Sequence, residues 1–424
     1  MNDSNPSEKK CHDMQDSNDS YWKLSLAVLT VSAFMMSMSY TMMMPFLPMY
    51  LLLELHVPEA DLNFWTSTTF SISFFIAAVC APFWGAMADK HSKKMMALRA
   101  SLSLAVCYFL LGLVETAEQL FVVRALQGFS CGLWPSTLAI MSGYAPKQRV
   151  GFCMGTMQAG MTAGTVLGPL IGGAISEYFA IRTSFYWAGL AMTVIFVLLL
   201  LVVKEKPAAK QTTRNNHATE PRAAANPLRD PVIQRMLFAG CIGQMSLLLV
   251  QPVLPMYLGE LQGSMDRIIF LTGVVFSVVG IAGVLASTPW GIAGQRFGYR
   301  PVLYITLTTS GIFGILQTIP SDIVSFTIVR FIGGLCMAGV FPAINAVITN
   351  TCPPEHRGKI FGYSYSTQQF GCVLGPLLGG WLASQWGNVA AVAASGVVLL
   401  PLALMLYCLR PKNTAAHELP SQNG

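Results

Sequence analysis

The stretch PFLPMYL, residues 45–51, returns almost unchanged as PVLPMYL at residues 252–258, and only one of its seven positions differs. A second stretch, LGPLIGG at 167–173, returns as LGPLLGG at 374–380, and both copies lie 207 residues after the original. One register therefore relates the two halves of the chain. An apolar, duplicated chain with Gly-Pro steps inside long apolar segments is typical of a membrane transporter built from two helical bundles.

Composition places most of the chain in lipid rather than in water. Of its 424 residues, 53% are apolar and 11% are charged, whereas soluble domains carry about 25% charged residues. The formal net charge of +6 comes from short basic clusters between apolar segments, and no basic stripe indicates a nucleic-acid partner. The ten cysteines and six histidines show no zinc-ligand spacing. We therefore expect no metal and no other cofactor, and interpret the cysteines as small apolar packing residues.

Twelve apolar segments are long enough to cross a bilayer, which needs about 20 apolar residues per helix. They cover residues 24–53, 64–88, 95–115, 119–143, 151–175, 183–203, 236–258, 268–292, 301–319, 323–347, 358–384 and 388–409. We expect an all-α membrane protein with twelve transmembrane helices in two pseudo-symmetric six-helix bundles. Its parts would be an N-terminal tail at 1–22, a first bundle at 23–203, a polar linker at 204–235, a second bundle at 236–409 and a C-terminal tail at 410–424.

The basic residues predict which side of the membrane faces the cytoplasm. Of 26 lysines and arginines, 22 fall in the two tails, the linker, the loops on the same side as the linker, or the span ends that adjoin them. Arg182 and Arg267 fall in loops on the opposite side, and Arg124 and Arg330 lie within spans. We therefore expect both termini and the linker to be cytoplasmic.

Two loops on the predicted cytoplasmic side carry related motifs built from a glycine and a basic cluster. Their members are Gly85, Asp89, Lys90, Lys93 and Lys94 after the second span, and Gly291, Arg296 and Arg300 after the eighth. The first copy resembles the loop 2–3 motif of the major facilitator superfamily, which implies a cytoplasmic latch between the bundles. Asp89 is its main candidate, because Gln295 replaces the acid in the second copy. The alternative is a basic loop that only sets topology.

Arginines stand within two spans, where a charge costs at least a few kcal/mol unless it meets a cavity or a partner. Arg124, Gln127 and Gly128 resemble the Arg-x-x-Gln-Gly motif of the same superfamily, which implies a role in proton coupling. Arg330 occupies the equivalent position in the second half, but the glutamine is lost there. The alternative for both arginines is a structural role, in which they bind backbone carbonyl groups.

The fifth span carries glycines at helical spacing around a proline, and the eleventh span repeats the pattern. The residues are Gly164, Gly168, Pro169 and Gly172 in the first copy, and Gly375, Pro376 and Gly379 in the second. The string resembles the antiporter motif of drug–proton antiporters, and in particular the MdtG-like multidrug exporters. The proline should bend the helix as a hinge, and a bulky residue at Gly168 should push the bundles apart. Ordinary small-residue packing is the alternative.

The family resemblance implies that spans 1, 4, 7 and 10 face a central cavity, and the first span holds a methionine stripe suited to varied apolar ligands. The substrate-binding candidates are Met35, Met38, Tyr40, Met42, Trp134, Gln158, Gln244, Gln251, Asn345, Tyr365 and Gln368. Plain packing is the alternative for the methionines. No Asp or Glu lies in the middle of a span, so proton coupling would use an acid at a span edge, such as Asp89, Glu54 or Glu115.

These features predict a secondary transporter that exports small, mostly hydrophobic compounds in exchange for protons by rocking two bundles about a central site. No nucleotide-binding motif and no set of catalytic residues indicates an enzyme. We expect a monomer in a bacterial inner membrane, with the substrate, protons and the lipid bilayer as its partners. Two alternatives stay open: transport of one metabolite, such as a siderophore or a sugar, in either direction, and a membrane receptor that does not transport.

Overall fold

The computed structural model describes residues 6–90, 92–146, 149–203, 227–353 and 357–409, without the side chains of 6–21, 82, 85–86, 88–90, 151, 227 and 358–359. Within these ranges the chain is helical apart from short connections, and it contains no strand. The N-terminal bundle consists of α1 (Pro6–Met43), η1 (Met44–Phe46), α2 (Leu47–Leu53), α3 (Glu59–Lys90), α4 (Lys93–Leu113), α5 (Ala117–Phe129), α6 (Leu133–Tyr144), α7 (Val150–Tyr178) and α8 (Ile181–Val202).

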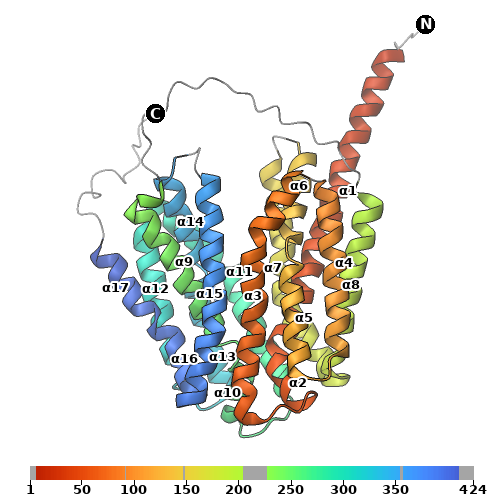
Figure 1. Cartoon of the computed structure of the whole chain (residues 1–424). Helices are drawn as coiled ribbons and strands as arrows, with labels where there is room; N and C mark the ends of the chain where they lie inside the picture. The colour runs from red at the N-terminus through yellow and green to blue at the C-terminus, as the bar shows by residue number, and fades with distance from the viewer. Residues whose placement is uncertain (1–5, 91, 147–148, 204–226, 354–356, 410–424) are drawn as a thin grey trace.

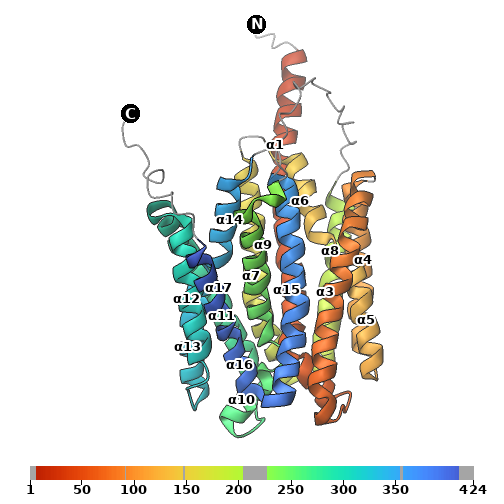
Figure 2. The ribbon, with the colours of Figure 1, turned by 60° about the vertical axis from the view of Figure 1, so that its left-hand side comes forward.

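The C-terminal half repeats this order after a one-turn helix. Its elements are η2 (Pro227–Arg229), α9 (Pro231–Leu249), α10 (Leu254–Gln262), α11 (Ile268–Phe297), α12 (Tyr299–Leu316), α13 (Ile323–Met337), α14 (Val340–Thr351), α15 (Arg357–Trp386), α16 (Asn388–Val397) and α17 (Leu399–Cys408). Figures 1 and 2 show the two halves as two groups of long helices that run side by side. The prediction of an all-α membrane protein is therefore confirmed.

Each predicted span falls on one helix or on a consecutive pair of helices. Nine helical stretches among the described residues are long and apolar enough to cross a membrane by themselves. The predicted spans 119–143, 301–319 and 358–384 are helical but are not among these nine. One reason is visible in span 119–143, which is divided into α5 of 13 residues and α6 of 12 residues.

The helix ends differ from the predicted boundaries. α1 already begins at Pro6, so most of the tail predicted at 1–22 has a helical backbone. α9 begins at Pro231, inside the predicted linker, while residues 204–226 and the tail 410–424 lie outside the described residues. Hydropathy indicates where a helix enters lipid, and it does not indicate where backbone hydrogen bonding begins.

Four spans at equivalent positions of the two bundles are broken. In the first span η1 interrupts the helix at Pro45, and in the seventh a turn containing Pro252 separates α9 from α10. Proline removes a backbone donor from the helix, which explains both breaks. In the fourth span Gly132 adopts a φ of 109°, a conformation that glycine accepts most easily. The tenth span breaks at Ala338–Gly339.

The repeated heptapeptide supplies the same anchor to each bundle. The Tyr50 hydroxyl donates to the Leu111 carbonyl at 3.1 Å, and its ring packs edge-on against Phe185 at 4.9 Å between centroids. The Tyr257 hydroxyl, in the second copy, donates to the Gln317 carbonyl at 3.3 Å. The sequence repeat is therefore also a repeat of side-chain contacts, and it ties the end of each broken first helix to its bundle.

The two bundles meet along α7 with α11 and along α3 with α15. Two equivalent serines cross these contacts: Ser71 donates to the Val373 carbonyl at 2.8 Å, and Ser277 donates to the Val166 carbonyl at 2.7 Å. We call these two hydrogen bonds the far-side seam. They lie in the halves of the helices nearest the connections at residues 54–58 and 263–267, opposite the ends of α8 and α9 that flank the linker.

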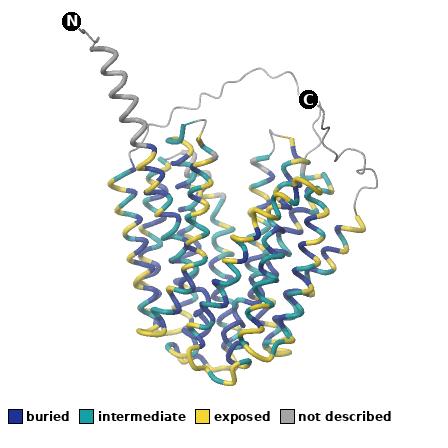
Figure 3. Tube along the Cα trace, turned by 180° about the vertical axis from the view of Figure 1, so that it is seen from behind, coloured by how far each residue is buried: buried dark blue, intermediate teal, exposed yellow. Residues whose placement is uncertain are grey.

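The helices diverge toward the other side, which we call the linker side (Figure 3). A side-chain carbon added at Gly155 of α7, Gly291 of α11 or Gly362 of α15 would meet open space. These glycines lie in the linker-side halves of their helices. The two bundles are therefore in close contact on the far side and apart on the linker side.

The positive-inside pattern predicts that the linker side is cytoplasmic. We expect a single cysteine at exposed Asp61, on the far side, to react with a membrane-impermeant thiol reagent in intact cells. A single cysteine at exposed Lys23, on the linker side, should react only after permeabilisation. Both variants need a background in which the ten native cysteines are replaced. The reverse labelling pattern would contradict the orientation.

Candidate functional site

Arg124 is completely buried, with 0% of its surface exposed. Its Nη1 donates to Gln127 Oε1 at 2.7 Å, its Nε donates to the Thr69 carbonyl at 3.4 Å, and its Nη2 lies 3.3 Å from Met44 Sδ. The spacing of three residues on α5 places Gln127 beside the guanidinium group. Among the described residues, no carboxylate forms an ion pair with Arg124. Neutral acceptors alone therefore support a charge that is expensive to bury.

The phenol groups of Tyr40 on α1 and Tyr108 on α4 lie within electrostatic range of Arg124. The Tyr40 hydroxyl is buried and has no hydrogen-bond partner, and its ring packs edge-on against Phe74 at 6.4 Å between centroids. The predicted coupling residues Arg124 and Gln127 thus lie next to the predicted substrate residue Tyr40. Gly128, the last residue of the motif, faces the Ser73 carbonyl of α3, and a side chain there would collide with it.

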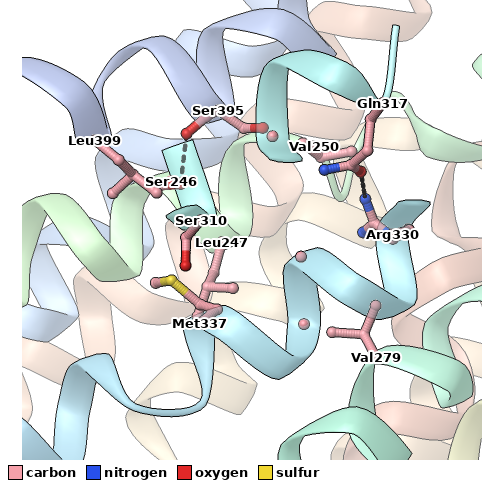
Figure 4. A pocket seen from close by; sticks show the side chains of 13 residues that line it. Ser246, Leu247, Val250, Val279, Ser310, Gln317, Arg330, Met337, Ser395 and Leu399 are labelled. Carbon is pink, nitrogen blue, oxygen red and sulfur yellow. Dashed lines mark hydrogen bonds between the residues drawn. The ribbon is translucent and has the colours of Figure 1, made fainter. Parts of the chain in front are cut away.

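Arg330 has a different partner from its counterpart. Its Nη1 donates to Gln317 Oε1 at 2.8 Å (Figure 4). The rings of Phe276 and Phe326 flank its guanidinium group at 6.0 and 5.9 Å. Sequence reasoning treated the second motif as weakened because the glutamine next to the arginine is lost. The structure shows that Gln317, from α12 rather than α13, supplies the amide oxygen instead.

Residues of both bundles converge around Tyr40. Tyr365 and Cys372 of α15 lie within electrostatic range of Tyr40, and Cys131, at the break between α5 and α6, lies within range of Tyr365. On the same face of the C-terminal bundle, the Gln368 side chain packs against Gly240 of α9. The structure thus brings Tyr40, Tyr365 and the two cysteines to one place between the bundles.

The remaining substrate candidates are distributed more widely. Half-buried side chains are those of Met35, Met38, Trp134, Gln244, Gln251 and Gln368, while Gln158, Asn345 and Tyr365 are exposed. Met42 is 1% exposed and packs against Gly172 of α7, so it serves as a packing residue in this conformation. Sequence reasoning missed Cys131 and Cys372, because isolated cysteines in apolar spans carry no signal that separates them from packing residues.

The repeated glycines of α7 form a close helix–helix contact within one bundle. Side chains at Gly164, Gly168 and Gly172 would collide with Phe34, Thr41 and Met42 of α1, respectively. The string of α15 meets α9 in the same way, because Gly375 faces the Met245 carbonyl and Gly379 the Leu249 carbonyl. The expectation that a bulky residue at Gly168 would push the bundles apart is therefore wrong. Its neighbours belong to α1 of the same bundle, and a helical face alone does not reveal which helix covers it.

The prolines of the string lie inside continuous helices, α7 for Pro169 and α15 for Pro376. The Pro169 carbonyl faces Gly273 of α11, where a side chain would collide with it. The region around Pro169 therefore touches the other bundle, although Gly168 and Gly172 face α1. The hinge role of these prolines stays a prediction.

Part of the predicted latch lies outside the described residues, namely the side chains of Asp89 and Lys90 and the surroundings of Gly85. Lys93 and Arg296 are exposed, Arg300 is half-buried, and Gly291 faces open space. The Lys94 ammonium group donates to the Leu200 carbonyl at 2.9 Å, so it caps the end of α8 within its own bundle. The latch therefore stays a prediction, and Lys94 has an intrabundle partner in this conformation.

The acids at the span edges have local partners. Glu54 forms an ion pair with Arg182 at 2.8 Å, and Glu260 accepts a hydrogen bond from Asn388 at the equivalent position of the other bundle, also at 2.8 Å. At the start of α5, hydrogen bonds from the backbone and from the Thr116 side chain lower the pKa of Glu118 below its ordinary value. Glu118 therefore stays ionised at neutral pH and is a poor proton carrier.

Two related helical bundles that meet along one side, each with an arginine inside a span, define a membrane transporter rather than an enzyme. The chain matches the Major Facilitator Superfamily over residues 29–286 and 268–424. The chain belongs to this family, and it is a multi-pass membrane protein. The family and the fold class predicted from the sequence are confirmed.

Several known proteins are similar along nearly the whole chain. Multidrug resistance protein MdtG of Yersinia enterocolitica is 30% identical over 402 residues, which cover 94% of this chain and 96% of MdtG. The MFS-type transporter YuxJ of Bacillus subtilis is 30% identical over 377 residues, covering 89% and 96% of the two chains. The crystal structure of the nucleoside transporter NupG has a TM-score of 0.75 at 15% identity, covering 91% of this chain and 98% of NupG.

A second solved structure has the same TM-score of 0.75. It is a bacterial homologue of the human lysosomal transporter Spinster in an inward-facing and occupied conformation, 14% identical, covering 92% and 96% of the two chains. At these identities the solved structures establish the fold alone.

The contact of Gly168 with α1 predicts a stability defect. Gly168→Leu should separate α7 from α1 and lower the thermal stability of the purified protein, because overpacking costs about 1–3 kcal/mol. Gly155→Leu, in the same helix but facing open space, is the matched control and should leave stability close to wild type. Equal thermal stability of the two variants would contradict this contact within one bundle.

Proposed function

We propose that the chain exports small, mostly hydrophobic compounds in exchange for protons, by alternating access of a site between its two bundles. The observation that carries the proposal is that Tyr40, next to the buried Arg124, lies within electrostatic range of Tyr365 and Cys372 of the other bundle. The similarity to MdtG supports multidrug export, because that relative is named for multidrug resistance. A bacterial inner membrane with a cytoplasmic linker is the location that we propose.

The contacts between the bundles support a rocking motion. In this conformation the far-side seam is closed by Ser71 and Ser277, and the linker-side glycines Gly155, Gly291 and Gly362 are uncovered. The reverse state would break two hydrogen bonds, each of which contributes about 0.5–1.5 kcal/mol. It would bring α7 and α11 together at their linker-side ends. Small residues there allow the backbones of two helices to approach closely.

The groups around the site suit uncharged, amphipathic compounds. Aromatic and sulfur-containing side chains such as Tyr40, Met38 and Cys372 offer apolar, adaptable surface. Gln244 and Gln368, which are half-buried, offer hydrogen bonds without charge. No described acid lies among them, so the site lacks the carboxylate that would attract a cationic compound.

We propose that Arg124 links proton movement to the motion of the bundles. Its charge rests on neutral partners from three elements: Gln127 on α5, Thr69 on α3 and Met44 at the break after α1. A change of position at any of these elements alters the stability of the buried charge. The proton would come from an acid at a span edge, with Asp89 and Glu115 as the remaining candidates, because Glu54 is paired with Arg182.

The function can be tested by drug sensitivity in a bacterial host that lacks its own exporters. We expect expression of the wild-type chain to raise resistance to several chemically unrelated hydrophobic compounds. A protonophore should make these compounds accumulate inside the cells. Resistance to none of them, with transport of a single metabolite, would replace multidrug export by the metabolite alternative.

Arg124 provides the sharper test of coupling. Arg124→Ala should insert and fold but reduce export driven by a pH gradient by about 5-fold to 150-fold, the range of typical coupling free energies. Arg124→Lys should retain part of the activity, because the charge remains while the planar fork of donors is lost. The measurement is uptake into inverted vesicles with an imposed pH gradient, with Arg229→Ala, at an exposed arginine outside the predicted latch, as control. Full export by Arg124→Ala would leave Arg124 as a structural residue.

A further inference from the structure

The C-terminal bundle contains a cavity of about 70 Å³ next to Arg330. It is lined by residues of α9, α11, α12, α13, α16 and α17. Figure 4 shows Arg330 hydrogen-bonded to Gln317 at one end, and Ser310, Leu247 and Met337 at another. The cavity lies inside the bundle and is distinct from the site between the bundles.

The cavity lies where the second half of the chain carries three smaller side chains than the first half. At three positions around the arginine, the first half carries Tyr40, Tyr108 and Gln127, and the second half carries Leu247, Gly314 and Gly333. The three first-half residues lie beside Arg124, and all three second-half residues line the cavity. The surroundings of the two arginines therefore differ. Polar side chains fill the space beside Arg124, whereas the space beside Arg330 is a cavity.

Two polar groups at the cavity are hydrogen-bond donors that have no acceptor. Arg330 Nε and Ser310 Oγ are buried and have no hydrogen-bond partner in the described part of the chain. The Gln317 amide oxygen satisfies only Nη1 of the arginine. Asp322, the acid nearest to Arg330 along α13, uses its carboxylate to cap that helix through the Ser325 backbone N–H at 2.9 Å. No described carboxylate forms an ion pair with Arg330.

We propose that this cavity binds a small monovalent inorganic anion of the size of chloride, held by the Arg330 guanidinium group. A volume of about 70 Å³ exceeds what one water needs, about 10–15 Å³ by the same measure. An anion beside Arg330 accepts a hydrogen bond from its unpaired Nε–H and also neutralises the buried charge, whereas a water molecule accepts the hydrogen bond and leaves the charge. The apolar remainder of the wall, with Leu247 and Met337, tolerates a polarizable halide. The anion would stabilise the C-terminal bundle.

The proposal predicts chloride-dependent stability of the purified full-length protein. We expect the Tm to rise saturably as sodium chloride replaces sodium gluconate at constant ionic strength, and sodium bromide to act in the same way. Bromide-soaked crystals should show anomalous density beside Arg330. Identical Tm values in chloride and gluconate would mean that the cavity holds only water, and would overturn the proposal.

Two variants and a control connect the effect to the cavity. Gly333→Gln restores the residue that the first half has at this position, and the site has room, since an added Cβ would lie 3.4 Å from Phe313 Cβ and 4.0 Å from Gln317 Nε2. This variant should fold and lose the chloride response, because the amide fills the cavity. Arg330→Gln should lose the response as well, whereas Arg296→Gln, at an exposed arginine, should keep it. A chloride response that persists in Gly333→Gln would contradict the site.

Discussion

The packing of backbone directly against backbone, α7 on α1 and α15 on α9, is the constraint on which the rest of the structure depends. Glycines make it possible, because a single added carbon at Gly172 or Gly379 would collide with a main-chain carbonyl of the neighbouring helix. Within lipid there is no hydrophobic drive between helices, so close van der Waals contact of this kind holds a bundle together. Each bundle can then move as a unit, because contacts of this kind recur over several turns of its helix pairs.

The contact between the bundles has a different character. It rests on a few small residues and on two equivalent serine hydrogen bonds, from Ser71 and Ser277, at the far side. Their net contribution is modest compared with the packing inside each bundle. Strong seams within the bundles and a weak seam between them are the mechanical requirement for alternating access, since a small free-energy difference can then exchange two arrangements of rigid parts.

The two halves have diverged most around their arginines. In the first half, Arg124 is fully buried, and the side-chain oxygen of Gln127, on the same helix, accepts a hydrogen bond from Arg124 Nη1. In the second half, Gln317 from a neighbouring helix takes over, and Gly333 stands where the first half has glutamine. Duplication supplied two copies of a costly buried charge. One copy lies next to residues of the other bundle, and the other lies beside a cavity among the helices of its own bundle.

The sequence predicted the architecture well, because a strict repeat and apolar segment length depend only on local composition. It predicted which residues stand near one another less well. The glycines around Gly168 form one helical face, but the pattern does not tell whether α1 or the other bundle covers that face. Gln317 and Cys372 carry no motif, and only the three-dimensional arrangement places them beside Arg330 and Tyr40. The start of α1 at Pro6 was missed because a polar sequence can continue a helix beyond the membrane.

The most direct test of alternating access is the distance between spin labels on the two sides of the protein, measured by double electron–electron resonance as the pH is varied. One pair at Gly155 and Gly291 reports the linker side, and one at Asp61 and Ser384 reports the far side. We predict two populations in which the linker-side distance shortens when the far-side distance lengthens. Distances that stay fixed at both sides, or that change in the same direction, would contradict the account.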